Sequence, residues 1–312
     1  MSRIPDDQAT RALGRWIGTT TPTLLGEGME GSVYEIDESR VAKLWFSGSV
    51  DLSRRMATFY DVLNAKSFAF SVPRIVQVAA VEGRVVTIER RLTGSTLSAA
   101  LAAGTIRPDD GYAVFVDILV ELAAGGELAA ARELSVLGEE SPLFVPGEDF
   151  PLALARLAGR RVERFRPVLS RAVEGFEAKA AALVGRLREV DSGRRAVVHG
   201  DLIPGNILVD VAGRPSAVLD WGFLTTEGDP AFEAAVAAAI FDMYGPEARQ
   251  VEQDLLDRIT ERMGYDRVAL LVYRAAYSLI SANAFDPLGR DGHFAWCVAA
   301  LNRADVTRAL LD

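Results

Sequence analysis

Short apolar runs separated by turn residues make up the chain as far as residue 92. Runs of β-branched and aromatic residues favour strands, and Gly, Pro and Asp clusters between them favour turns. The pattern predicts strands over residues 32–36, 41–45, 74–80 and 84–89, with a helix near residues 51–64. Residues 1–92 are therefore expected to form a strand-rich unit that carries one helix.

From residue 93 onward the pattern becomes helical. Apolar residues recur at helical spacing on one face of residues 173–187; they are Val173, Phe176, Ala180, Leu183, Val184 and Leu187. The longest apolar stretches, residues 112–122 and 268–284, contain Asp117 and Arg274, so they predict buried helices and no membrane span. The expected fold class is α+β, with residues 93–312 as a larger, mostly helical unit.

A polar motif interrupts the helical part between short apolar runs. It consists of His199-Gly200-Asp201-Leu202-Ile203-Pro204-Gly205-Asn206, with Leu219-Asp220-Trp221-Gly222 further on. The apolar runs place Asp201, Asn206 and Asp220 at the ends of short strands. Phosphoryl transfer from ATP needs one carboxylate near the nucleophilic hydroxyl, and an amide and a second carboxylate to hold magnesium. A polar hairpin of turn residues is the alternative, but it leaves the acids and their spacing unexplained.

A second motif lies upstream and spells G-x-G-x-x-G-x-V over residues 26–33. A dinucleotide site has the same glycine spacing, but there the last glycine opens a helix, whereas β-type sequence follows here. Strands flanking a glycine flap, then a strand that carries a lysine, are how a kinase covers the phosphates of ATP. Gly26, Gly28 and Gly31 would let the backbone approach the phosphates, and Lys43 would supply a positive charge. The alternative for Lys43 is an ordinary solvated lysine on an edge strand.

Composition narrows the classes of function. The chain has 312 residues, of which 49% are hydrophobic, and a formal net charge of -9. That charge argues against nucleic acid or an anionic membrane as a partner. The single cysteine, Cys297, excludes an internal disulfide and suits a reducing cytoplasm. Charged residues near the N-terminus, such as Arg11 and Arg15, leave no apolar core for a signal peptide.

Together the motifs resemble the aminoglycoside phosphotransferase family, which comprises bacterial small-molecule kinases related to protein kinases and choline kinases. The resemblance rests on H-G-D-x-x-P-G-N-I-L-V followed by L-D-W-G and covers most of the chain, from Gly26 to Pro230. It implies a protein-kinase-like fold of two lobes, residues 1–92 and 93–312, joined by a hinge at residues 90–94.

The same resemblance implies roles for individual residues. Asp201 would be the catalytic base, and Asn206 and Asp220 would bind Mg²⁺. The residues that would bind the nucleotide are Gly26, Gly28, Gly31 and Lys43 at its phosphates and Arg90 and Leu92 at the hinge. His199 would pack beneath the loop as a structural residue.

The sequence departs from the family at two places. Ile203 stands where the family often has histidine. The helix after Lys43 should offer a glutamate to orient that lysine, yet no glutamate lies between Lys43 and Pro73. Asp51 and Asp61 are the carboxylates that remain in this region, so either one of them substitutes or Lys43 is held by phosphate and magnesium alone.

The segment after Asp220 points to a small substrate. Only a short turn, residues 223–228, separates it from the next helix, so there is no platform for a protein substrate. An insert over residues 104–195 contains acids that could meet a cationic substrate or simply form a solvated loop; they are Glu139, Glu140, Glu148 and Asp149. No obligate protein partner is evident.

The expected function is phosphorylation of a hydroxyl on a small molecule by a kinase that uses ATP, or GTP, with Mg²⁺. An aminoglycoside-like antibiotic is the favoured substrate, which would make the chain a resistance kinase. A metabolic kinase of the choline, homoserine or sugar type is an alternative. Another alternative is a catalytically weak nucleotide-binding regulator, motivated by the missing glutamate.

Overall fold

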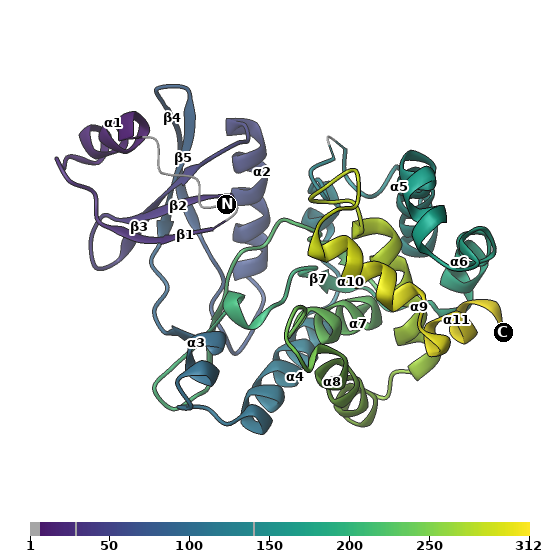
Figure 1. Ribbon diagram of the computed structural model, residues 1–312. Coiled ribbons are helices and arrows are strands. Elements are labelled where there is room, and N and C mark those ends of the chain that lie inside the picture. Colours follow the sequence, from purple (N-terminus) through teal and green to yellow (C-terminus); the bar gives the residue numbers. More distant parts are fainter. Residues whose placement is uncertain (1–6, 29, 140) are drawn as a thin grey trace. The chain divides into compact units, whose positions relative to one another are not determined.

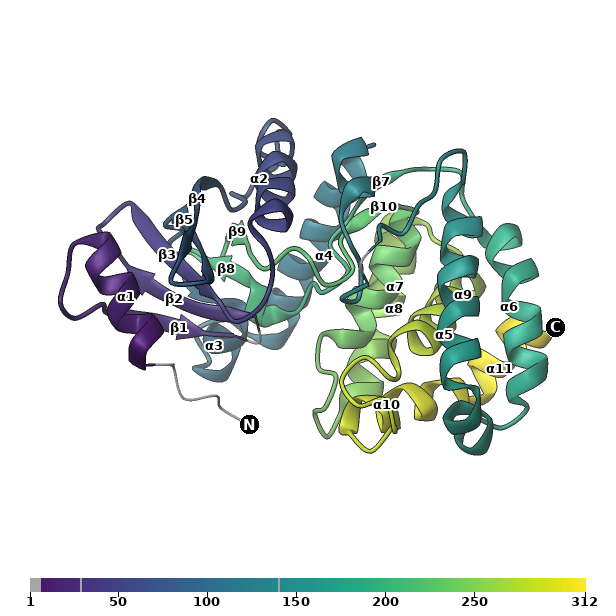
Figure 2. The same cartoon turned by 90° about the horizontal axis from the view of Figure 1, so that it is seen from above.

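The computed structural model describes residues 7–28, 30–139 and 141–312, apart from the side chain of Asp7. The chain divides into two compact units, the first made of Met1–Gly94 with Ser216–Leu219 and the second of Ser95–Pro215 with Asp220–Asp312. Figures 1 and 2 label their helices and strands. Within the described residues no helix is both long enough and apolar enough to cross a membrane.

The first unit is built on an antiparallel sheet with the strand order β1-β2-β3-β5-β4. Its strands are β1 (Leu24–Glu27), β2 (Gly31–Glu35), β3 (Arg40–Trp45), β4 (Ile75–Val81) and β5 (Arg84–Arg90). The helix α2 (Val50–Asn64) follows β3, and the hydroxyl of Ser49 caps it by accepting a hydrogen bond from the N–H of Leu52. The predicted strands and the predicted helix are all present.

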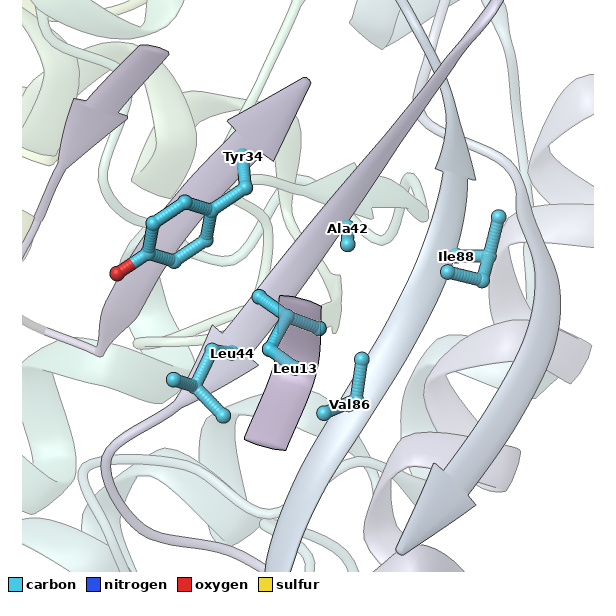
Figure 3. Close-up of a cluster of buried hydrophobic side chains, with 6 residues drawn as sticks. All are labelled: Leu13, Tyr34, Ala42, Leu44, Val86 and Ile88. Atoms are coloured by element: carbon cyan, nitrogen blue, oxygen red, sulfur yellow. The ribbon is translucent and has the colours of Figure 1, made fainter. Parts of the chain in front are cut away.

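A further helix, α1 (Asp7–Ile17), was not predicted, yet it completes the core of this unit. Leu13 of α1 is fully buried and packs into a cluster with the sheet residues Tyr34, Ala42, Leu44, Val86 and Ile88 (Figure 3). The hydroxyl of Thr10 also lies 3.1 Å from that of Tyr34. The helix therefore covers one face of the sheet through few apolar residues, which is why the apolar pattern did not reveal it.

The second unit is mainly helical. Its helices are α3 (Leu97–Ala102), α4 (Pro108–Ala124), α5 (Phe150–Ala172), α6 (Phe176–Val190), α7 (Pro230–Ile240), α8 (Ala248–Met263), α9 (Arg267–Ser281), α10 (Gly292–Leu301) and α11 (Ala304–Leu311), with short 3-10 turns η1 (Ala129–Glu133) and η2 (Pro204–Asn206). The short strands outside the large sheet are β6 (Ser95–Thr96), β7 (Ala196–Val198), β8 (Ile207–Val209), β9 (Pro215–Val218) and β10 (Thr226–Gly228). An antiparallel sheet in one unit and helices in the other confirm the predicted α+β, kinase-like fold class.

Two buried helices, α7 and α9, form the centre of the second unit. Every residue of α7 is buried, and α7 packs against α9, which is buried over most of its length. The helices α5 and α6 pack side by side next to α9 (Figure 2). Both long apolar stretches of the sequence are helices, as predicted.

Two local predictions were wrong in detail. Val173 lies after the end of α5, and α6 begins only at Phe176 behind the left-handed Gly175. Val184, expected on the buried face of α6, is 43% exposed, while the stem of Lys179 is buried and its Nζ donates to the carbonyl of Leu301 at 2.7 Å. A long cation can bury its methylenes when its head finds a carbonyl, which an apolar pattern does not show.

Candidate active site

The loop of residues 199–206 leaves the buried strand β7 through a sharp bend. Gly200 has a φ of 76°, and a Cβ atom at this position would lie 2.6 Å from the Cβ of Leu224. Both the left-handed backbone and the lack of space exclude any other residue there. The next residue, Asp201, is half-buried. The bend therefore brings a carboxylate out of the core directly after a rigid strand.

His199 lies beneath this bend, as predicted for a structural residue. Its ring is fully buried and packs against Trp221 with 4.5 Å between ring centroids. Its Nδ1 accepts a hydrogen bond from the backbone N–H of Asp201 at 3.2 Å. The imidazole thus supports the backbone of Asp201.

The turn η2 fixes the distance between Asp201 and Asn206. The side-chain Nδ2 of Asn206 donates to the backbone carbonyl of Asp201 at 2.9 Å. The backbone N–H of Asn206 donates to the carbonyl of Ile203, also at 2.9 Å. The amide nitrogen is therefore occupied inside the loop. Its oxygen is the kind of ligand atom that Mg²⁺ prefers.

Asp220 lies at the start of a second turn, residues 220–225, and has an unusual backbone. Its φ is 54°, which non-glycine residues rarely adopt, and its side chain is exposed. Such strain is most often found at functional sites, where the surrounding structure maintains it. This makes Asp220 the most distinctive backbone position of the candidate site.

A buried threonine ties the two segments together. The hydroxyl of Thr225 donates to the carbonyl of His199 at 2.9 Å and accepts from the N–H of Gly222 at 2.8 Å. Because Thr225 is fully buried, water cannot replace these bonds. The residues around Asp201 and around Asp220 therefore form one hydrogen-bonded structure within the second unit.

Glu233 supports the same loop from below and was missed by sequence reasoning. It lies within the buried helix α7, and its Oε2 accepts a hydrogen bond from the N–H of Gly200 at 2.9 Å. Burial raises the pKa of Glu233 to about 7, while the N–H groups of Gly200 and His199 favour the charged form and the charge of Asp201 opposes it. The available signal was an acid inside an otherwise apolar, alanine-rich segment.

Asp229, just before α7, is a second missed anchor. It is fully buried, and its Oδ1 caps α7 by accepting from the N–H of Ala231 at 2.8 Å. Its Oδ2 accepts from the N–H of Ser192 at 2.7 Å and from the hydroxyl of Tyr273 at 3.0 Å. One carboxylate thus joins α7, α9 and the segment before β7. The sequence signal was Asp229-Pro230, a typical helix start.

In the first unit the glycines of the flap differ in what surrounds them. A Cβ atom at Gly31 would lie 2.4 Å from the carbonyl oxygen of Leu44 on the neighbouring strand, so packing alone requires glycine. At Gly26 and Gly28 such an atom would meet nothing within 4 Å. The fold itself therefore does not explain these two glycines, which agrees with a need for close approach by a ligand. Met29 of this motif lies outside the described residues.

Lys43 on β3 points toward the flap. Its Nζ lies 3.5 Å from a carboxylate oxygen of Glu30 and 4.0 Å from the centroid of the Trp45 ring. The aspartates considered from sequence have arginine partners instead: Asp51 pairs with Arg54 at 3.3 Å and Asp61 with Arg74 at 3.6 Å. Glu30 was overlooked because it precedes Lys43 in the chain, and only the hairpin brings the two together.

The predicted hinge residues lie at the end of β5. Arg90 is the last residue of β5 and pairs with Arg40 of β3, and its N–H donates to the carbonyl of Arg74 at 2.9 Å. Leu92 is half-buried and belongs to no helix or strand. Their backbone position is compatible with a nucleotide contact, and that role remains a prediction.

The acids of the insert are engaged with other parts of the second unit. Glu139 forms an ion pair with Arg160 at 2.5 Å, and Glu148 pairs with Arg156 at 2.8 Å. Asp149 caps α5 by accepting from the N–H of Leu152 at 3.0 Å. Glu140 lies outside the described residues. Glu139, Glu148 and Asp149 thus serve the local fold.

Two side chains of the second unit suit magnesium. Among the described residues no group of three or more His, Cys, Asp or Glu could hold a metal ion alone. Magnesium bound with nucleotide takes one or two protein oxygens and completes its shell with phosphate and water. The amide oxygen of Asn206, whose nitrogen is bonded to Asp201, and the exposed carboxylate of Asp220 fit that requirement.

Comparison with known proteins agrees with the fold and the motifs. The family model described as "Phosphotransferase enzyme family" matches residues 21–271. No curated protein matches the chain.

Several solved structures have the same fold at low sequence identity. Aminoglycoside phosphotransferase APH(3'')-Id from Streptomyces rimosus is 17% identical, with a TM-score of 0.56 over 92% of this chain and 99% of that one. The GDP complex of aminoglycoside 2'-phosphotransferase-IIIa is 14% identical, with a TM-score of 0.58 over 98% and 99% of the two chains. Macrolide 2'-phosphotransferase MphH from Brachybacterium faecium is 18% identical, with a TM-score of 0.52 over 90% and 92%.

Proposed function

This chain belongs to the phosphotransferase enzyme family, whose members are small-molecule kinases, and we propose that it transfers the γ-phosphoryl group of ATP to a hydroxyl of a small molecule with Asp201 as the base. The observation that carries this assignment is the hydrogen-bonded structure around Asp201. The ring of His199 accepts from the N–H of Asp201 itself, while Thr225 donates to the carbonyl of His199 and Glu233 accepts from the N–H of Gly200, the two residues before it. Rigid placement of the groups that meet the reacting atoms is the main contribution of a protein to this reaction.

Each residue of the site has a defined task in this proposal. Asp201 orients the acceptor hydroxyl and takes its proton as the new oxygen–phosphorus bond forms. Asn206 and Asp220 would hold Mg²⁺, which neutralises charge on the phosphate oxygens when it is bound. Lys43 would contact the phosphates, and this contact would partly replace its ion pair with Glu30. Gly26 and Gly28 would leave room for the phosphates beside the flap, and Gly31 keeps the flap against β3.

The nucleotide is expected to be ATP, with GTP as the alternative, and Arg90 and Leu92 would lie beside its base. Structures of the same fold include complexes described with ADP and with GDP, which supports a purine nucleotide without choosing between the two.

For the acceptor, an aminoglycoside-like antibiotic or a related sugar-bearing compound is our first candidate. Chains of this fold have been solved as complexes with streptomycin and with kanamycin. A metabolic kinase of the choline, homoserine or sugar type would use the same motifs, so it belongs in any test.

A transfer assay tests the proposal. Purified protein, Mg²⁺ and ATP are incubated with a panel that contains aminoglycosides, other glycosides, choline and homoserine, and products are detected by the mass of an added phosphoryl group. The proposal expects one class of acceptor to be phosphorylated. Nucleotide binding without transfer to any acceptor would instead indicate a regulator.

A further inference from the structure

The helix that follows Lys43 does not supply an acid to hold it. No glutamate lies between Lys43 and Pro73, and the two aspartates of that stretch pair with arginines. The buried residues of α2 are, apart from Ser53, apolar or aromatic. Two residues beside the lysine ammonium, Trp45 and Glu30, belong to the sheet and the flap instead.

Lys43 and Trp45 lie on the face of the sheet that points away from α1. Side chains alternate between the two faces of a strand, so residues two apart share a face. The other residues of β3 point into the cluster that packs on α1 (Figure 3). Thr87 of β5 is the cross-strand partner of Lys43, and Glu89 follows two residues later. The four side chains therefore lie together on one face.

A chain of hydrogen bonds joins three of these side chains. The indole N–H of Trp45 donates to Oγ1 of Thr87 at 3.0 Å, and the Thr87 hydroxyl donates to a carboxylate oxygen of Glu89 at 2.6 Å. An indole nitrogen can only donate and a carboxylate can only accept, so the direction of the chain is fixed. Thr87 is fully buried, and water cannot take over its bonds. The indole is therefore held at a fixed position and orientation.

The face of this indole carries the ammonium of Lys43. Its Nζ lies 4.0 Å from the centroid of the Trp45 ring, and the lysine side chain is only 13% exposed. Tryptophan is the ring that attracts a cation most strongly, and partial removal of water strengthens the attraction. The hydrogen-bond chain ends on the negative charge of Glu89, which polarises the indole in the sense that favours a cation on its face.

The ring and the carboxylate of Glu30 differ in how they would respond to a nucleotide. Glu30 is half-exposed, and its oxygen lies 3.5 Å from Nζ of Lys43. A carboxylate competes with phosphate oxygens for the ammonium and repels them by its charge. A neutral ring does neither, so it can keep the ammonium in place while phosphates replace the contact with Glu30.

We propose that Trp45, held by Thr87 and Glu89, is a positioning residue that aims the ammonium of Lys43 at the nucleotide phosphates in place of the glutamate that α2 lacks. This inference rests on the proposed phosphotransfer, because it takes the phosphates of a bound nucleotide as the target of Lys43. A lysine that is already ordered loses less conformational entropy when it binds them. The role of the ring should therefore be visible in nucleotide affinity.

Substitutions at Trp45 test the inference in two backgrounds. Trp45→Leu removes the ring, whereas Trp45→Phe loses the N–H but keeps a ring face. Each is made alone and together with Lys43→Met. Trp16→Leu on α1, which removes an exposed tryptophan of the same unit, is the matched control. Calorimetry gives the Kd of a non-hydrolysable ATP analogue with Mg²⁺, and transfer from ATP to the acceptor panel is measured separately.

We expect Trp45→Leu to raise the Kd about tenfold and Trp45→Phe to raise it about threefold or less, because only the first removes the cation–π contact. The value of kcat/KM for ATP should fall by similar factors. Trp16→Leu should leave both quantities unchanged. In the Lys43→Met background, Trp45→Leu should add little, since the ring acts through the ammonium.

Substitutions at Thr87 test the support of the ring and replace the first pair if melting shows Trp45→Leu to be unfolded. Thr87→Val keeps the shape of the side chain and removes the hydroxyl, so the Kd should rise about threefold. Thr87→Ser restores the hydroxyl and should return the Kd to the wild-type value. A wild-type Kd in a folded Thr87→Val would overturn the part assigned to Thr87 and Glu89.

Different failures separate the inference from the proposed function. The inference is overturned if Trp45→Leu leaves the Kd unchanged, or raises it by the same factor with and without Lys43; phosphotransfer by the wild type then still stands. Transfer to no acceptor by the wild type overturns the proposed function, while the Kd values still decide whether Trp45 positions Lys43.

Discussion

Replacing Glu233 with glutamine should remove a pH dependence of stability that arises beneath the 199–206 loop. Glu233 is buried in α7, and its pKa rises from the ordinary value of 4.5 to about 7 because burial disfavours the charged form. Between these values the folded protein holds a proton that the unfolded chain has already released. The free energy of unfolding must therefore fall as the pH rises through this window.

The size of the effect follows from the pKa shift. The rise from 4.5 to about 7 corresponds to about 3 kcal/mol, at about 1.4 kcal/mol for each pKa unit. That is a large fraction of the 5–15 kcal/mol by which folded domains are typically stable, as an order of magnitude. Below the lower value both states are protonated, and above about pH 7 both are charged, so the dependence should be confined to the interval between them.

Chemical denaturation at a series of pH values measures this directly. Glutamine keeps the shape of the side chain and can still accept the hydrogen bond from Gly200, but it does not titrate. The free energy of unfolding of the wild type minus that of Glu233→Gln should fall between about pH 4.5 and pH 7 and then level off. A difference that stays flat over this range, or that rises with pH, would refute the reasoning.

Three further substitutions test the flap, the lysine and the link between the two loop segments. Gly31→Ala should destabilise the fold by about 1–3 kcal/mol, because its Cβ would meet the carbonyl of Leu44. Gly28→Ala should shift the melting temperature little but weaken nucleotide binding. Equal effects of the two substitutions on the melting temperature would contradict this. Lys43→Met should cut turnover strongly. Because Lys43 and Glu30 form one ion pair, the double variant with Glu30→Gln should lose little more than Lys43→Met alone. Additive losses in kcat/KM would contradict that pairing. Thr225→Val should cost about 1–3 kcal/mol of stability and lower kcat more than it raises KM, since two buried hydrogen bonds are lost; unchanged steady-state kinetics would count against a positioning role.

Elements whose signal is local could be predicted from the sequence. The strands of the first sheet, α2, α7 and the two long buried helices all follow from periodicity and turn residues. The helix α1 was not predicted, because few apolar residues make its contacts: Leu13 is fully buried, and Ala9 and Ile17 pack against the same cluster. Likewise the turn expected over residues 223–228 ends in β10, whose pairing with β7 depends on a strand far away in the sequence.

The residues of the candidate site also divide into those indicated by the local sequence and those that only tertiary contacts reveal. Asp201 and Asn206 are close in sequence, so their spacing alone indicated that they act together. Glu233 and Glu30 gain their importance from contacts with residues that are distant along the chain or folded back by a hairpin. The arginine partners of Glu139 and Glu148 in the insert likewise come from helix α5 and could not be read from the local sequence. Sequence reasoning finds the chemical groups, and tertiary contacts decide which of them are available.

The central claim is that Asp201, held by this buried structure, assists transfer of phosphate to a hydroxyl. The most direct test compares the wild type with Asp201→Asn, which keeps the size of the side chain but cannot take a proton, in single-turnover transfer from γ-labelled ATP. Both proteins should bind nucleotide with Mg²⁺ equally well and melt at similar temperatures. The account predicts a loss of transfer rate of about a hundredfold or more in the variant. Transfer at the wild-type rate by Asp201→Asn would contradict it.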